Sequence, residues 1–258
     1  MKKRLDVLMV ERNLAPSRTA AQALVLEGKV RVAGQVECKA SRSVDESASV
    51  EVEAPPRFVS RGGDKLEGAF ALWGPEGTET LAPDCRLDAA GCVCLDVGSS
   101  TGGFTDCLLQ HGATRVMAVD VGTNQLAYKL RTDPRVWVRE NFNARYMTAA
   151  DLPETPTVAV TDVSFISLKL ILPPIATVLA PGGRIMALIK PQFEVGRGGA
   201  PGGLVRDEAL RLAARDGIVA FGREMLGLDL LGLAVSPVPG REKGNLEYLS
   251  YWRKPATR

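Results

Sequence analysis

Blocks of apolar residues alternate with amphipathic segments through residues 92–258 of this chain. The apolar blocks are short and nearly unbroken, and each of the first five is followed by a segment of helical periodicity or by a turn. Strands with this composition are buried on both faces, as happens when helices cover both sides of a parallel sheet. The expected strands are residues 92–98, 115–122, 135–141, 157–165 and 184–195, and the expected helices are residues 101–112, 124–133, 168–182 and 209–227.

The last two apolar blocks differ from the others because no helix lies between them. Residues 228–240 and 245–252 are joined by a loop alone, so they should pair as an antiparallel hairpin. A parallel sheet that ends in an antiparallel hairpin resembles the topology of S-adenosylmethionine-dependent methyltransferases and differs from the ordinary dinucleotide-binding fold.

The first 54 residues predict a separate α+β module. Residues 4–13 have the periodicity of a short helix, and Ser17 is a suitable N-cap for a second helix that Gly28 ends. Residues 30–36 alternate around Ala33-Gly34 like a hairpin, and residues 49–54 read as a further strand. Because Pro55-Pro56 marks a boundary, we expect a small domain over 1–56, a linker over 57–64 and an α/β domain over 65–258.

Charge is spread unevenly between these parts. The net charge is +2, but residues 1–43 carry nine Lys/Arg against four Asp/Glu, a charge of +5 that leaves −3 for the rest. A basic module on a mildly acidic body favours a polyanionic partner for the module.

Cysteine and histidine counts exclude several classes of protein. The five cysteines form no CxxC pair, and an odd number in apolar segments indicates reduced thiols. The single histidine, His111, stands before Gly112 where a helix should end, which leaves little room for a Ser-His-Asp triad or a multi-histidine metal site. The chain has neither a secretory signal nor an apolar run of 18 residues, so we expect a cytoplasmic protein without a membrane association.

A glycine-rich loop follows the first strand of the α/β domain. Residues 95–106, LDVGSSTGGFTD, contain Gly-x-x-x-Gly-Gly, which is neither the dinucleotide fingerprint nor a P-loop. Glycines there let the backbone approach a ligand, and Asp120, at the end of the next strand, can accept the ribose hydroxyls of either NAD or S-adenosylmethionine.

Three charged residues should meet at the carboxyl edge of the sheet. Asp162 follows the fourth strand and Lys190 the fifth, and Glu247 stands near the start of the last strand. In the methyltransferase topology the last strand runs antiparallel beside the fifth, which places Glu247 next to Lys190.

A fourth charged residue comes from a resemblance. Residues 58–69, FVSRGGDKLEGA, resemble the Ser-Arg-x-x-x-Lys-Leu element of FtsJ-type RNA 2′-O-methyltransferases. That resemblance implies a catalytic Lys-Asp-Lys-Glu tetrad of Lys65, Asp162, Lys190 and Glu247. We hypothesise that Gly62-Gly63 is a hinge, which RNA docking orders and which thereby seats Lys65.

The N-terminal module also resembles a known one. SRTAAQALVLEGKVRVAGQV, residues 17–36, is similar to the S4 RNA-binding domain, in which basic residues contact structured RNA, mostly at phosphates. The expected RNA contacts are Arg4, Arg18, Lys29, Arg31, Lys39 and Arg61.

The whole chain resembles the TlyA family, named both for hemolysins and for rRNA 2′-O-methyltransferases. The resemblance rests on the S4 pattern and on TDVSFISL, IKPQFEVG and GNLEYL, and it implies S-adenosylmethionine as cofactor, cytidines of rRNA as substrate, no metal and a monomer. Residues 140–145, ENFNAR, match the family's Thr-Asn-Ala-Arg element with Phe142 in place of Thr. The expected cofactor contacts are Asp96, Gly98, Ser99, Ser100, Thr101, Gly102, Gly103, Asp120, Val121, Asn143 and Asp162.

Some members of the TlyA family carry an additional helix after the last strand and modify both ribosomal subunits, whereas others end soon after it and modify only the large one. Because this chain stops soon after the last strand, the resemblance favours the large subunit, with the small subunit as the alternative. Other functions stay open at this point: a noncatalytic RNA-binding assembly factor, a membrane-lysing hemolysin and a nicotinamide oxidoreductase. The intact loop and tetrad disfavour the first, the lack of an apolar span the second, and the glycine spacing with the terminal hairpin the third.

Overall fold

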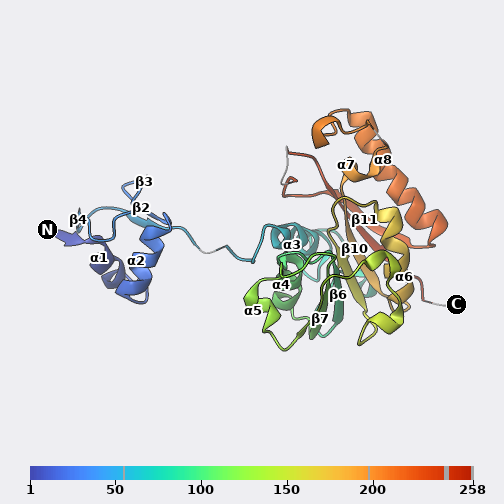
Figure 1. The fold of residues 1–258 in the computed structure, drawn as a ribbon, viewed down its shortest axis with the longest axis horizontal. Coiled ribbons are helices and arrows are strands. Elements are labelled where there is room, and N and C mark those ends of the chain that lie inside the picture. The colour runs from blue at the N-terminus through green and yellow to red at the C-terminus, as the bar shows by residue number, and fades with distance from the viewer. Residues whose placement is uncertain (55, 197, 241–243, 257–258) are drawn as a thin grey trace. The chain divides into compact units, whose positions relative to one another are not determined.

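A computed structural model describes residues 1–54, 56–196, 198–240 and 244–256 (Figure 1). Pro55, half of the predicted domain boundary, is outside the described residues. The chain forms two compact units, Met1–Pro56 and Arg57–Arg258.

The first unit packs two helices against two small antiparallel sheets. Its core is built from helix residues such as Leu5, Met9 and Val25, which are fully buried. Ser17 caps the second helix by accepting a hydrogen bond from the Ala20 amide, as the sequence predicts. The elements are β1 (Lys2–Arg4), α1 (Leu5–Glu11), α2 (Arg18–Leu26), β2 (Val30–Val32), β3 (Gln35–Val36), β4 (Ser43–Asp45) and β5 (Val50–Val52), with sheet orders β1-β4 and β3-β2-β5.

The predicted hairpin of the first unit forms between β2 and β3. Ala33 and Gly34 both have positive φ, 49° and 79°, as the two central residues of a type I′ turn require. The two strands β1 and β4 were not predicted from the sequence.

The second unit is a seven-stranded sheet in the order β11-β12-β10-β9-β6-β7-β8. All neighbours pair in parallel except β12, which is antiparallel to both β10 and β11. This confirms the methyltransferase topology predicted from the sequence. The strands are β6 (Val93–Val97), β7 (Arg115–Val119), β8 (Val136–Arg139), β9 (Val158–Thr161), β10 (Arg184–Ile189), β11 (Asp229–Val235) and β12 (Tyr248–Arg253).

Helices cover both faces of this sheet, and the side chains of each strand divide between two cores (Figure 1). Along β10, Met186 and Leu188 join the core under α3 and α4, whereas Ile185, Ala187 and Ile189 join the core under α6 and α8. The helices are α3 (Gly62–Trp73), α4 (Gly103–Gln110), α5 (Tyr128–Arg131), α6 (Leu172–Val178), α7 (Pro191–Glu194) and α8 (Glu208–Ala220), and short helical turns lie at η1 (Pro83–Cys85), η2 (Ala144–Tyr146), η3 (Ala149–Asp151), η4 (Leu168–Leu170), η5 (Pro201–Gly203) and η6 (Phe221–Met225).

Two predicted helices are shorter than expected. The helix expected over 124–133 is reduced to α5. Asn124 has a left-handed φ of 55° and Ala127 has an extended backbone with a ψ of 139°, so helical winding begins only at Tyr128. The helix expected over 168–182 begins only at Leu172, after the turn η4, where Pro173 occupies a first-turn position that needs no amide donor.

The structure places Gly62 and Gly63, expected as a hinge, in a helix, and a movement of this segment on RNA docking stays a prediction. Both glycines are the first residues of α3, and Gly63 lies against the buried ring of Phe58. A Cβ added to Gly63 would come 2.2 Å from Phe58, whereas one added to Gly62 would meet nothing nearer than 3.4 Å. Close packing against Phe58 therefore requires glycine at position 63.

Alanine at the two positions should have opposite outcomes. We expect Gly63→Ala to lower the free energy of unfolding by about 1–3 kcal/mol, because the new methyl group must displace Phe58. Gly62→Ala should leave it unchanged or slightly raised, since a helical position gains from alanine. Denaturation followed by tryptophan fluorescence measures this unit alone, because Trp73, Trp137 and Trp252 all lie in it. Equal effects of the two variants would contradict the packing argument.

Candidate active site

A cavity of about 650 Å³ opens at the carboxyl edge of the sheet. The glycine-rich loop after β6, the start of α3 and the segments that follow β9 and β10 surround it. Its lining consists of Val59, Ser60, Arg61, Gly62, Lys65, Gly98, Ser99, Ser100, Thr101, Gly103, Phe104, Asp162, Ser164, Phe165, Lys190, Gln192, Phe193 and Glu247.

Four charged side chains meet in this cavity and alternate in sign. Lys65 Nζ lies 2.7 Å from Glu247 Oε2 and 3.5 Å from Asp162 Oδ2. Lys190 Nζ lies 2.5 Å from Asp162 Oδ1 and donates a hydrogen bond to Ser164 Oγ at 2.9 Å. The order Glu247–Lys65–Asp162–Lys190 is a neutral chain of two ammonium and two carboxylate groups.

The sheet topology explains how residues so distant in sequence meet. Asp162 directly follows β9, Lys190 directly follows β10, and Glu247 directly precedes β12. The antiparallel register pairs Ile189 with Tyr248, so the end of β10 and the start of β12 coincide. Lys65 enters from the first turn of α3, and the structure thus brings together all four residues expected from the sequence.

The four residues are largely withdrawn from water. Lys65 and Lys190 are each 8% exposed and Glu247 is 3% exposed. Charges this buried are stable only when paired, so the loss of any one member would leave a partner uncompensated. The partly open side of the cavity leaves the two ammonium groups accessible to a hydroxyl group that enters it.

The glycine-rich loop forms a cradle of bare backbone beside these charges. Gly98 and Gly102 have φ values of 82° and 100°, which suit glycine, and Ser100 has a φ of 47°. A Cβ on Gly102 would lie 2.3 Å from Leu130, and one on Gly103 would lie 2.3 Å from Ser60. These close approaches explain why no side chain fills the loop at those positions.

Asp120 lies across this loop, and backbone amides hold its carboxylate. Its Oδ2 accepts from the Ser100 amide and its Oδ1 from the Gly122 amide, both at 2.7 Å. A half-exposed carboxylate fixed in this way can accept the two hydroxyls of a ribose. The bare loop and this carboxylate together fit the amino-acid and ribose portions of S-adenosylmethionine.

Some expected cofactor residues lie outside the cavity. Asp120, Val121 and Asn143 do not line it, and the exposed Asn143 instead accepts a hydrogen bond from the Arg145 amide. Gly102 and Asp96 are not among the residues that line the cavity either. Their contacts with a cofactor remain predictions.

Asp96 is buried beneath the loop with an unusual environment. It is 1% exposed, its Oδ2 accepts from Thr105 Oγ1 at 2.6 Å, and its Oδ1 has no hydrogen-bond partner among the described residues. Burial raises the pKa of Asp96 to about 7, although the Thr105 hydrogen bond opposes the rise. The buried carboxyl group therefore lowers the free energy of unfolding when it ionises, and the size of this effect depends on pH.

The basic residues expected to contact RNA have different environments. Arg4 and Arg18 form ion pairs with the buried Asp6, at 2.9 and 3.2 Å, and so also stabilise the first unit. Lys29 pairs with Glu27 at 2.5 Å. The side chains that remain most available to a phosphate are those of Arg31 and Lys39 in the first unit and Arg61 at the rim of the cavity.

Sequence reasoning missed the aromatic wall of the cavity. Phe165 is 86% exposed and has a φ of 64°, and its ring centroid lies 5.1 Å from that of Phe193. An exposed phenyl ring on a strained backbone is unfavourable for a free protein and suggests a ligand-binding role. The motif around Phe165 was recognised in the sequence, but the direction of its ring depends on the fold.

Known protein families match both units of the chain. The FtsJ-like methyltransferase family matches residues 58–254 and the S4 domain matches residues 3–50. A Mycobacterium tuberculosis protein named 16S/23S rRNA (cytidine-2′-O)-methyltransferase TlyA is 40% identical over 258 residues, 99% of this chain and 91% of that protein. A Campylobacter jejuni protein named 23S rRNA (cytidine-2′-O)-methyltransferase TlyA is 40% identical over 164 residues, 62% of each chain.

A solved structure extends the comparison to the fold. A Streptococcus thermophilus protein described as a hemolysin superposes with a TM-score of 0.72 at 40% identity, covering 98% of this chain and 89% of that one. Among the described residues of the present chain, no helix has both the length and the apolar character needed to cross a membrane.

The raised pKa of Asp96 should make the free energy of unfolding depend on pH. Its native pKa of about 7 exceeds the ordinary 3.8, so between these values the native protein binds more protons than the unfolded chain. The free energy of unfolding should therefore fall as pH rises, by up to about 1.4 kcal/mol per pH unit, until the carboxyl is ionised above pH 7. Asp96→Asn should flatten this part of the profile, measured by denaturant titrations at pH 5 to 8. Parallel profiles for the two proteins would contradict the assignment.

Proposed function

Because the chain belongs to the TlyA family, in which an S4 domain precedes an FtsJ-like methyltransferase domain, we propose that it methylates the ribose 2′-hydroxyl of a cytidine in ribosomal RNA, with S-adenosylmethionine as methyl donor. The observation that carries this proposal is the alternating set of four charges beside a bare backbone loop. A ribose hydroxyl is a weak acid, and such a set can orient it and stabilise the charge that develops as it reacts.

The ammonium groups of Lys65 and Lys190 act on the hydroxyl oxygen in this proposal. S-adenosylmethionine supplies an electrophilic methyl group on a sulfonium centre. Lys190 already donates to a hydroxyl, that of Ser164, so its N–H groups are oriented for an oxygen acceptor. Paired with Asp162, the Lys190 ammonium group would position the hydroxyl oxygen and stabilise the charge that develops on it. The oxygen would take the methyl group as the carbon–sulfur bond breaks, and the hydroxyl proton would pass to water in the partly open cavity.

The carboxylates keep the two lysines in place. Asp162 lies between both ammonium groups, and Glu247 holds Lys65 from the other side at 2.7 Å. Without the two carboxylates the lysine side chains would be mobile, and they would lose conformational entropy when substrate binds. Positioning of the two ammonium groups therefore explains why charges of opposite sign alternate around the cavity.

An RNA substrate also fits the aromatic and basic residues at the rim. Phe165 offers an exposed ring on which an unstacked base can lie, and Arg61 offers a cation for a phosphate. The S4 domain would supply further phosphate contacts through Arg31 and Lys39, which makes binding sensitive to salt.

We infer that the large-subunit RNA is the substrate. The names of both the Mycobacterium and the Campylobacter relatives include 23S rRNA, and of these two only the Mycobacterium name includes 16S rRNA. The second candidate function, an RNA-binding assembly factor without catalysis, would require the S4 domain alone and would not need the four buried charges.

The tetrad is tested by Lys190→Ala in a methyl-transfer assay with labelled S-adenosylmethionine and separated ribosomal subunits. We expect label in a 2′-O-methylated cytidine of the large subunit and a loss of about 100-fold or more in kcat for the variant. Binding of S-adenosylmethionine, measured by calorimetry, should change less than turnover does, because the glycine-rich loop follows β6 whereas Lys190 follows β10 on another part of the cavity wall.

Lys169→Ala is the matched control, since Lys169 is an exposed lysine near the same sheet edge that does not line the cavity. It should retain wild-type turnover. If neither subunit accepts label although the protein binds both RNAs tightly, the assembly factor becomes the better explanation; efficient labelling of the small subunit alone would refute the subunit preference.

The aromatic wall is tested separately with Phe165→Ala and Phe165→Tyr. If the ring stacks on the target base, alanine should cost about 1–3 kcal/mol of substrate interaction, which corresponds to roughly 5–150-fold in kcat/KM. Tyrosine keeps the ring and should restore most of the activity. Equal activity of the alanine variant and the wild type would show that Phe165 has no part in substrate binding.

A further inference from the structure

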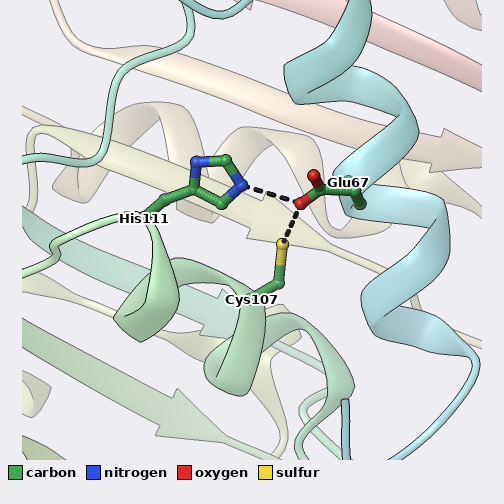
Figure 2. A group of neighbouring side chains, drawn as sticks. All are labelled: Glu67, Cys107 and His111. Carbon is green, nitrogen blue, oxygen red and sulfur yellow. Dashed lines mark hydrogen bonds and ion pairs between the residues drawn. The ribbon is translucent and has the colours of Figure 1, made fainter. Parts of the chain in front are cut away.

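Three side chains of metal-ligating types meet between α3 and α4 (Figure 2), and none of them lines the cavity. They are Glu67 from α3 and Cys107 and His111 from α4 and its C-cap. His111 Nε2 lies 2.8 Å from Glu67 Oε2, and Cys107 Sγ lies 3.8 Å from the same oxygen. All three donor atoms lie within 4.8 Å of one another.

The local structure explains why the three donors converge. Cys107 and His111 are four residues apart, so they occupy one face of a helix, one turn above the other. That face packs on α3 through the close contact at Gly103, which brings Glu67 opposite to them. The prediction from sequence that His111 ends a helix is confirmed, since it is the C-cap of α4, but the histidine also faces this cluster.

Neighbouring residues hold two of the donors in fixed orientations. The His111 ring stacks on Phe70 with a centroid distance of 3.7 Å and an interplanar angle of 8°. Arg57 binds the other carboxylate oxygen, Glu67 Oε1, at 2.6 Å and leaves Oε2 directed at the sulfur and the imidazole. Outer partners of this kind orient the ligands in known metal sites.

We propose that Glu67, Cys107 and His111 form a binding site for a borderline divalent cation of the Zn²⁺ class. Zinc binds thiolate at about 2.3 Å and imidazole or carboxylate at about 2.0–2.2 Å, which places tetrahedral ligand atoms roughly 3.3–3.7 Å apart. The two spacings to Glu67 Oε2, 2.8 and 3.8 Å, lie on either side of that range, and the third, from sulfur to imidazole nitrogen, is no more than 4.8 Å, so rotation of the side chains must bring the donors to the tetrahedral distances. Hard cations such as Mg²⁺ are disfavoured, because they avoid sulfur and nitrogen ligands.

Accessibility agrees with this assignment. The side chains of Glu67 and His111 are 30% and 27% exposed, whereas Cys107 is buried at the base of the cluster, so a cation can enter from solvent and find the thiol beneath. Water would complete the four-coordinate shell on the exposed side.

A bound cation would join the helix that carries Lys65 to the helix that follows the glycine-rich loop. The cluster lies two residues beyond Lys65 on α3 and four residues beyond Gly103 on α4. A cation there would stabilise the mutual position of these helices without touching the cavity, whose lining includes none of the three ligands.

Cobalt binding to the full-length protein tests the site. After removal of metals with a chelator, we expect Co²⁺ titration to produce a thiolate-to-cobalt charge-transfer band and intense tetrahedral visible bands at one equivalent, both lost on addition of Zn²⁺. Cys107→Ser should abolish the charge-transfer band, and His111→Gln should weaken Co²⁺ binding at least tenfold. Cys38→Ser, at an exposed thiol in the first unit, is the matched control and should bind like the wild type.

Two results would overturn the proposal. One is the absence of a charge-transfer band in the wild type, and the other is an unchanged titration in both site variants, which would place any bound cobalt elsewhere. If Cys107→Ser fails to fold, the partly exposed His111 still decides the matter through His111→Gln. The readout is spectroscopic and needs no methyl transfer, so its outcome is independent of the function proposed above.

Discussion

The antiparallel placement of β12 between β10 and β11 is the constraint on which the candidate active site depends. A strand inserted in parallel would present its end, rather than its start, at the carboxyl edge of the sheet. The observed direction puts Glu247 at the edge where Asp162 and Lys190 already lie. Lys65 then completes a set of charges in which each member has a partner of opposite sign, and burial of the set becomes tolerable.

Close packing of α3 against α4 is the second condition for this geometry. Gly63 fits against Phe58, and Gly103 fits against Ser60 and the Gly63 amide, so the two helices begin almost in contact. The glycine-rich loop and Lys65 are thereby fixed relative to each other within one rigid layer. The same packing brings Glu67 to Cys107 and His111, so the cluster between the two helices and the geometry of the cavity depend on the same contact.

Two carboxylates show how burial is compensated differently in the two units. Asp6 is fully buried but accepts from Arg4, Arg18 and Gln22, and these hydrogen bonds lower its pKa despite the effect of burial. Asp96 is equally buried, has one hydrogen-bonding partner through Thr105 and no cation among the described residues within ion-pair distance, so its pKa rises. Arginines assigned from sequence to RNA binding thus also have a structural role, which a list of basic residues does not distinguish.

The sequence by itself determined the class of fold, the order of the strands and the family, because apolar periodicity and short motifs are local properties of the chain. It also named the four charged residues, since strand ends and topology place Asp162, Lys190 and Glu247 at one edge. The tertiary structure alone decided that Gly62 and Gly63 are helical, that the exposed Phe165 lines the cavity, and that Glu67 meets Cys107 and His111. These features depend on contacts between segments far apart in the chain, and the packing of one helix against another has no signature in either helix alone.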